Sequence, residues 1–221
     1  QFKNISFALI QGQTETRPWK VGGRENIQIL NQNINGFVLI NPKLYEWATH
    51  RFPTKKIILI PNGVESHFFH HKSVKNSKNN IICVAGLQKF KQIDLLIKAM
   101  EFLPDKTLTI VGQGPEYDSL SNLISQLKLK DRVTITSCPH EKIIKLYQGA
   151  SVFSLPSSNL EAFGVAYLEA MASGLPVVGP DDELRRYIIA DAGILTDVSN
   201  SQLYAQHLKK AFEVDWQEKP I

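Results

Sequence analysis

The stretch from Pro156 to Val178, PSSNLEAFGVAYLEAMASGLPVV, limits the possible folds of this chain more than any other part of the sequence. It follows the apolar run ASVFSLP, which is typical of a buried strand, and its residues SSN favour a turn. A helical pattern begins after Phe163-Gly164 and ends at Gly174, two residues before Pro176. The order strand, loop, helix and strand predicts a parallel unit whose helix begins at the carboxyl edge of a sheet. The predicted apolar face of this helix consists of Val165, Leu168, Met171 and Ala172.

The start of this helix is suited to a phosphate group. The first N–H groups of a helix have no internal partner, and the helix dipole adds positive charge there. Gly164 has no Cβ, so an anion can approach the backbone. Glu161 precedes the helix, and Glu169 lies about five residues inside it, roughly 8 Å along the axis. Because carboxylates accept hydrogen bonds from vicinal hydroxyls, the two acids are predicted to bind a sugar or ribose beside the phosphate.

Each of these residues also has a purely structural interpretation. Glu169 would be an ordinary exposed helix residue, and Glu161 an acid favoured near a helix start. Gly164 would serve only close packing of helix and sheet. The complete string, with two acids separated by seven residues and followed by AMASGLPVV, favours a functional site over these separate explanations.

From residue 79 onwards, six apolar runs alternate with helical patterns. This order predicts an α/β fold with a doubly wound parallel sheet and a ligand at the carboxyl ends of the strands. The predicted strands are NIICVAG, TLTIVGQG, RVTITS, SVFSLPS, PVVGP and AGILTDV. The other predicted helices are KQIDLLIKAME, one opened by Pro115 with Tyr117, Leu120, Ile124 and Leu127 as its core face, HEKIIKLYQGA, ELRRYII capped by Asp181-Asp182, and SQLYAQHLKKAF.

Residues 1–57 contain about two strand–helix units, which are too few for an independent core. FALIQ and GFVLINP are predicted strands, and ENIQILNQN and KLYEWATHRF are predicted helices. Residues 58–221 are expected to form the second domain. The polar residues 65–78 are predicted to be a linker, because their three histidines lack other metal ligands at matching spacing.

Composition excludes several classes of function. The net charge of +4 is compatible with an anionic ligand or peripheral contact with an anionic membrane surface. Nucleic-acid binding is not expected, because no basic patch is interleaved with aromatic residues. No apolar run approaches the roughly 20 residues needed to cross a bilayer. Cys83 and Cys138 have no metal-ligand spacing and are expected to be inert thiols in the cytoplasm, and no bound metal is predicted.

The string around Glu161 and Glu169 resembles the donor-binding signature of retaining glycosyltransferases with the GT-B fold, specifically glycosyltransferase family 4. The resemblance implies one Rossmann-like half of such an enzyme. It also implies that Glu161 faces the donor hexose and Glu169 the nucleotide ribose. The diphosphate would be bound by the backbone N–H groups of Phe163, Gly164 and Val165.

A second part of the resemblance lies in VAGLQKFKQID, where the family has an arginine and a lysine that contact the diphosphate. An ungapped overlay places Lys91 on the lysine and Gly86 on the arginine. The missing arginine weakens diphosphate stabilisation or leaves that task to Lys89 or to helix dipoles. Structurally, Lys91 would be a solvent-exposed lysine at a helix start, which the helix dipole slightly disfavours.

Two further loops are implied to border the nucleotide. VGQGPEY is not a dinucleotide fingerprint, because Tyr117 occupies the third glycine position, and it is expected to act through its backbone. Cys138, in SCPHEK, is a candidate contact of the base, whereas His140 is interpreted as a polar residue at a helix start rather than a catalytic one.

The expected function is therefore that of a retaining hexosyltransferase domain in glycan biosynthesis, with a UDP-, GDP- or ADP-sugar as donor. Glu161 and Lys91 are the candidate catalytic residues, and no cofactor or metal is required. The acceptor, a glycan or lipid-linked molecule, would bind to the other domain. By resemblance the chain is expected to be a fragment, so the alternative is a nucleotide-binding module that is inactive in isolation. A flavodoxin-like scaffold would need no nucleotide affinity, and a dehydrogenase would need a glycine fingerprint that is missing.

Overall fold

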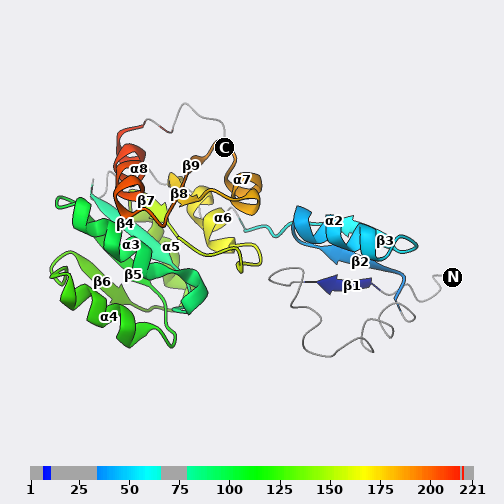
Figure 1. Ribbon diagram of the computed structural model, residues 1–221, viewed down its shortest axis with the longest axis horizontal. Coiled ribbons are helices and arrows are strands. Elements are labelled where there is room, and N and C mark those ends of the chain that lie inside the picture. The colour runs from blue at the N-terminus through cyan, green and yellow to red at the C-terminus, as the bar shows by residue number, and fades with distance from the viewer. Residues whose placement is uncertain (1–6, 11–33, 66–78, 215, 217–221) are drawn as a thin grey trace. The chain divides into compact units, whose positions relative to one another are not determined.

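The structure, a computed structural model, describes residues 7–10, 34–65, 79–214 and 216 (Figure 1). The chain divides into two compact units. The first comprises Gln1–Gly63 with Asn159–Phe163, and the second comprises Val64–Ser158 with Gly164–Ile221. The predicted helix ENIQILNQN and almost all of the predicted linker lie outside the described residues.

The first unit contains a parallel sheet in the order β1-β2-β3 and helix α2. The strands are β1 (Phe7–Ile10), β2 (Gly36–Leu39) and β3 (Lys56–Leu59), and the helix is α2 (Pro42–Arg51). FALIQ and GFVLINP are thus confirmed as strands and KLYEWATHRF as a helix. Helix α2 begins where the sequence favours it, because Asn41 caps it and Pro42 occupies its first turn. The buried apolar side chains among the described residues of this unit are Phe37, Leu39, Ile40, Leu44, Ala48, Phe52 and Phe163.

The second unit contains a six-stranded sheet in the order β6-β5-β4-β7-β8-β9, with every neighbouring pair parallel. The predicted doubly wound sheet is therefore confirmed. The chain moves outward from β4 in one direction and then from β7 in the other, so the switch point lies between β4 and β7. The strands are β4 (Asn80–Val84), β5 (Thr107–Val111), β6 (Val133–Thr136), β7 (Val152–Ser154), β8 (Val177–Pro180) and β9 (Gly193–Thr196).

Helices connect these strands and contact one another in two groups. Helix α3 contacts α4 and α8, whereas α6 contacts α7. The α-helices are α3 (Ile93–Ala99), α4 (Tyr117–Gln126), α5 (His140–Gln148), α6 (Val165–Ala172), α7 (Glu183–Ile189) and α8 (Ser201–Glu213). Two 3-10 helices, η2 (Lys89–Lys91) and η3 (Met100–Phe102), flank α3.

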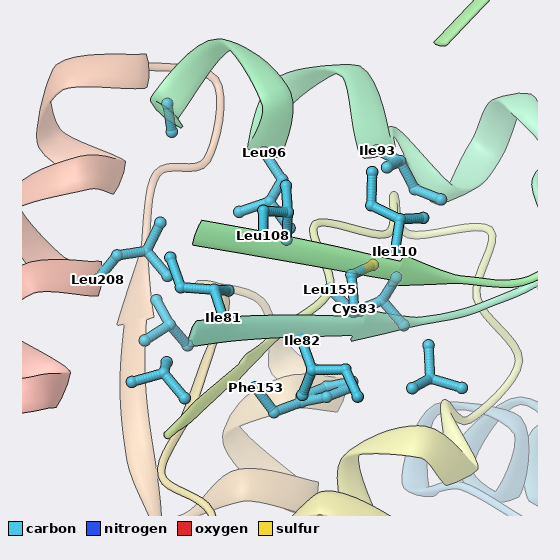
Figure 2. Packing of buried hydrophobic residues seen from close by; sticks show 14 of the residues in the cluster. Ile81, Ile82, Cys83, Ile93, Leu96, Leu108, Ile110, Phe153, Leu155 and Leu208 are labelled. Carbon is cyan, nitrogen blue, oxygen red and sulfur yellow. The ribbon is translucent and has the colours of Figure 1, made fainter. Parts of the chain in front are cut away.

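The core of the second unit lies on both faces of strand β4. Ile81, Ile82 and Cys83 are fully buried, as expected for a central parallel strand covered on both sides. In Figure 2, Leu96 of α3 lies over one face of the strands, and Ile82 and Phe153 lie on the other. The apolar runs therefore identified the right strands, because this sheet is buried throughout its centre.

Three details of the predicted helices are wrong. Helix α6 buries Tyr167, Ala170 and Met171, of which only Met171 belongs to the predicted face, and Val165 is 36% exposed. Nearly every residue of α6 is apolar, so its periodicity carries little information about which face is covered.

Helix α4 begins at Tyr117, two residues after Pro115, and the side chain of Tyr117 is 50% exposed. The N–H of Glu116 donates to the carbonyl of Leu87, which holds the preceding residues in a turn. The predicted helix KQIDLLIKAME is interrupted, because Gln92 has a left-handed backbone (φ 51°) between η2 and α3.

Candidate functional site

Most of the predicted site residues follow the two strands on either side of the switch point, whereas Cys138 follows β6. Gly86 and Lys91 come after β4, and the segment from Glu161 to Val165 comes after β7. A backbone hydrogen bond joins the two connections: the N–H of Ser158 donates to the carbonyl oxygen of Phe90 at 2.8 Å. In an open parallel sheet, the switch point is the position where ligands bind.

A pocket of about 580 Å³ lies at the carboxyl ends of β4, β5 and β6. It brings together the predicted residues Gly86 and Cys138 with the loop after β5, which the sequence also placed beside the nucleotide. The described lining residues include no charged side chain, so the pocket suits a neutral, partly apolar group. They are Val84, Ala85, Gly86, Val111, Gly112, Gln113, Ser137, Cys138, Pro139 and Ile143.

Two backbone segments that line this pocket approach each other closely. A Cβ at Gly112 would lie 1.9 Å from the carbonyl oxygen of Ala85, so only glycine fits there. A Cβ at Gly86 would lie 3.9 Å from the carbonyl oxygen of Gln113, which is ordinary contact. The side-chain amide of Gln113 donates to the hydroxyl of Ser137 at 3.0 Å and orders the exposed rim.

Lys91 is the last residue of η2, close to a predicted helix start, and it is half-buried. Its Nζ lies 5.0 Å from the ring centroid of Phe90. The nearby thiol of Cys83 is fully buried, and burial raises its pKa to about 12 despite the positive charge of Lys91. Cys83 is therefore inert, as predicted. Lys91 does not line the pocket that contains Gly86 and Cys138.

Helix α6 begins at the predicted position. Gly164 is its N-cap, with φ 89° and ψ 59°, a left-handed conformation that explains the glycine independently of any ligand. Its other end has the hydrogen bonds of a glycine-terminated helix, from Gly174 N–H to Met171 and from Leu175 N–H to Ala170. The predicted stop at Gly174 is confirmed.

Glu169 is held by a buried tyrosine that the sequence did not single out. The hydroxyl of Tyr147, in α5, donates to Oε2 of Glu169 at 2.9 Å. Burial, and then the neighbouring carboxylate, raise the pKa of Tyr147 well above its usual range, so its hydroxyl remains a proton donor. In the sequence Tyr147 has only the signal of a core residue on an amphipathic helix.

Glu161 lies in a segment that belongs to the first unit, whereas Glu169 and Val165 belong to the second. Glu161 is 9% exposed and Phe163 is 3% exposed. The side-chain amide of Asn41 donates to the carbonyl oxygen of Ala162, between these two residues, at 2.9 Å. Asn41 could not be found from the sequence, because it lies 121 positions away.

The sequence analysis also did not identify a buried arginine on α7. Arg185 is 1% exposed, and its Nη2 donates to the carbonyl oxygens of Ser157 and Ser158 at 2.7 and 2.8 Å. Next to it, Asp182 caps α7 as predicted, and Asp181 pairs with Arg186. Within the ranges that the structure describes, no group of three or more His, Cys, Asp or Glu side chains is arranged to bind a metal ion. None of the helices described there is long and apolar enough to cross a membrane.

Comparisons with known proteins identify the family and the fold of this chain. Residues 65–219 match the family described as glycosyl transferases group 1. The exopolysaccharide phosphotransferase SCO2592 of Streptomyces coelicolor is 30% identical over 181 residues, which are 78% of this chain and 19% of that protein. The D-inositol 3-phosphate glycosyltransferase of Corynebacterium aurimucosum is 34% identical over 145 residues, which are 60% of this chain and 34% of the relative. The chain thus spans about a fifth to a third of the length of these relatives.

Solved structures show the same fold. Anabaena Alr3699/HepE, in complex with UDP and glucose, has a TM-score of 0.79 at 20% identity, covering 94% of this chain and 61% of that one. The pneumococcal O-GlcNAc transferase GtfA, in complex with UDP and GlcNAc, has a TM-score of 0.76 at 21% identity, covering 94% of this chain and 45% of that one. These structures show a GT-B-type fold, and the match over residues 65–219 shows that the chain belongs to the glycosyl transferases group 1 family.

Proposed function

We propose that this chain is the donor-binding part of a retaining glycosyltransferase of family 4, which transfers a hexose from a nucleoside diphosphate sugar. The observation that carries the proposal is the pocket at the carboxyl ends of β4, β5 and β6, beside the switch point. A ligand that fills this pocket and extends across the switch point reaches the loop after β7 and the start of α6. A nucleoside joined to a diphosphate has this extended form.

In this proposal the base lies in the pocket. Val84, Val111 and Ile143 supply apolar contacts, and the backbone at Gly86 and the side chain of Cys138 border the base. UDP, GDP and ADP all contain a flat, uncharged base that matches such walls. The complexes of Alr3699/HepE and of GtfA contain UDP, which makes UDP the first nucleotide to test.

The diphosphate would be bound by the backbone N–H groups of Phe163, Gly164 and Val165 and by the ammonium group of Lys91. The first amides of a helix are free of internal acceptors, and the helix dipole attracts an anion there. The hydrogen bond between Ser158 and Phe90 supports this assignment, because it ties the connection that contains Lys91 to the one that precedes α6.

The two acids would bind hydroxyl groups on either side of the diphosphate. Glu169 would accept hydrogen bonds from the ribose, and its partner Tyr147 leaves the rest of the carboxylate available for a ligand. Glu161 would orient the donor hexose and support positive charge at the anomeric carbon. These roles come from the family resemblance of the residues around them.

Transfer breaks the bond between the anomeric carbon and a diphosphate oxygen. The electron pair leaves with the diphosphate while the sugar ring gains oxocarbenium character. The acceptor hydroxyl then bonds to the anomeric carbon on the same face and passes its proton to the leaving diphosphate oxygen. Lys91 and the start of α6 would stabilise the leaving diphosphate, so we propose that no metal or other cofactor is needed. The acceptor would be a glycan or a lipid-linked molecule, and the latter would require peripheral contact with a membrane.

The first experiment measures nucleotide binding by the 221-residue chain. Isothermal titration with UDP, GDP and ADP should show binding of at least one of them. Glu169→Ala should weaken it about tenfold, because the ribose loses a charged acceptor. Lys91→Ala should mainly slow transfer when it is placed in a full-length enzyme. Binding of none of the three nucleotides would contradict the proposal.

A second candidate function is a nucleotide-binding module without activity of its own. It requires only the pocket at the carboxyl ends of β4, β5 and β6 and no acceptor site. The two possibilities differ in one measurement. Donor hydrolysis or hexose transfer by the isolated chain indicates an enzyme, whereas nucleotide binding without either reaction indicates the module.

A further inference from the structure

Arg185 is a buried charged residue that the proposed function does not use. Its guanidinium contacts one carboxylate and two backbone carbonyls. Nη1 lies 3.0 Å from Oδ2 and 3.4 Å from Oδ1 of Asp182, and Nη2 donates to the carbonyl oxygens of Ser157 and Ser158. Nε is buried and has no hydrogen-bond partner among the described residues.

Burying a guanidinium to this extent is costly, and the contacts with Asp182 and with the carbonyls of Ser157 and Ser158 offset part of that cost. Asp182 orients the arginine and caps α7 at the same time, because its Oδ1 accepts the backbone N–H of Arg185 at 3.0 Å. Nη2 can then donate its two N–H groups to two consecutive carbonyls, those of Ser157 and Ser158. The peptide between Ser157 and Ser158 is therefore held in a single orientation.

The opposite side of the same peptide segment is also bonded. The N–H of Ser158 donates to the carbonyl oxygen of Phe90, the residue before Lys91. A continuous series of contacts thus runs from Asp182 through Arg185 and Ser158 to Phe90 in η2. It links the two connections on either side of the switch point, and the base pocket is built from other residues.

We propose that Arg185 is a positioning residue for the diphosphate: it sets the spacing between the turn that contains Lys91 and the loop that leads to α6, without touching the donor. This inference rests on the proposed function. It predicts a selective defect. Loss of Arg185 should weaken the contribution of the β-phosphate to binding and leave the contribution of the nucleoside unchanged.

The test is the ratio of two dissociation constants, for a nucleoside monophosphate and for the matching diphosphate. Titration of the wild-type chain with UMP and UDP, GMP and GDP, and AMP and ADP identifies the pair that binds. In Arg185→Lys and Arg185→Met the preference for the diphosphate should fall about tenfold, while the affinity for the monophosphate stays within about twofold. Arg186→Met is the matched control on the same helix, because Arg186 is exposed and forms a surface ion pair with Asp181; it should keep the wild-type ratio.

Asp182→Asn provides a variant that keeps the helix cap and removes the charge that orients Arg185. It should lower the preference for the diphosphate over the monophosphate. If the Arg185 variants do not fold, this variant alone tests the inference. An unchanged ratio in the folded variants, or an equal loss of mono- and diphosphate affinity, would overturn the inference and leave the proposed function intact. A wild-type chain that binds none of the nucleotides would overturn the proposed function itself.

Discussion

At the scale of single residues, the candidate site contains side chains whose hydrogen-bond partners cannot be recognised in the sequence. Glu169 was identified from its motif, whereas its partner Tyr147 is an unremarkable aromatic residue on α5. A carboxylate with one oxygen bonded to a fixed donor is held in one rotamer. It can therefore accept a ligand hydroxyl without first losing conformational freedom.

Tyr147→Phe is predicted to weaken binding of the nucleoside diphosphate about threefold to tenfold, because Glu169 is no longer oriented. The ring is retained and continues to pack against Phe153 at a centroid distance of 6.0 Å, so stability should fall by only about 1 kcal/mol. Titration with the ribonucleotide and with its 2′,3′-dideoxy analogue provides the measurement. A similar loss for both ligands would show that Tyr147 does not act through the ribose.

Two glycines in the pocket are predicted to respond differently to the same substitution. Gly112→Ala should destabilise the second unit by several kcal/mol, because its Cβ would overlap the carbonyl oxygen of Ala85. Gly86→Ala should be nearly neutral, since its Cβ has ordinary contact distances. Urea denaturation of both variants measures the difference, and equal destabilisation would contradict it.

Gly86 also allows the missing arginine to be introduced. Gly86→Arg places a positive charge at the position where the resembling family has one, and it should strengthen diphosphate binding relative to the monophosphate. Gly86→Met is the uncharged control. Titration of both variants with the mono- and diphosphate measures this preference. If Gly86→Arg and Gly86→Met both prefer the diphosphate to the same extent as the wild type, the expectation is wrong.

At the scale of elements, the loop after β7 is held at several points. Arg185 binds the carbonyls at its start, and Asn41 binds the carbonyl of Ala162 next to Glu161. Asn41 has two separate tasks, because its Oδ1 accepts the N–H of Leu44 and caps α2 while its Nδ2 donates to Ala162. A loop held in this way can keep Glu161 buried and oriented.

The two tasks of Asn41 are separable by substitution. Asn41→Ala should lose both and lower the unfolding free energy by about 1–2 kcal/mol. Asn41→Asp should keep the cap and lose only the bond to Ala162, so it should retain most of the stability yet make residues 159–163 more sensitive to limited proteolysis. Equal stability of the two variants in chemical denaturation would contradict this division.

At the scale of the whole molecule, the second unit buries one thiol and two phenol groups whose ionisation in the folded state is unfavourable. Burial raises the pKa values of Cys83, Tyr147 and Tyr204, in the case of Cys83 to about 12. Each group binds its proton more tightly in the folded state than in the unfolded state. Stability contributed by these groups is therefore complete below the unfolded pKa values and is lost as the pH rises above them.

The melting temperature is accordingly predicted to fall between about pH 9 and pH 11, with each group contributing up to about 1.4 kcal/mol per pH unit once its unfolded form ionises. Thermal unfolding followed at several pH values measures the effect, and tyrosinate absorbance should increase only with unfolding for the two buried tyrosines. A melting temperature that does not change across this range would contradict the prediction.

Much of the architecture was predictable because its signals are local. Apolar runs marked the strands of the buried sheet, and Gly174 and Asp182 marked helix ends through backbone chemistry that involves only near neighbours. Local signals failed in α6, where nearly every residue is apolar and the periodicity does not reveal the covered face. They also failed at the delayed start of α4 after Pro115 and at the interruption by Gln92 before α3.

The sequence by itself determined the order of strands and helices, the loop that begins at Ser157 and the acids around it, since periodicity and motif spacing are properties of the chain. The tertiary structure alone decided which strands became neighbours, and hence that the ends of β4, β5 and β6 enclose one pocket. It also brought Tyr147 to Glu169 and Arg185 to Ser157 and Ser158. Such pairings follow from the packing of helices on a sheet, and residues that are far apart in the chain have no sequence pattern that reveals them.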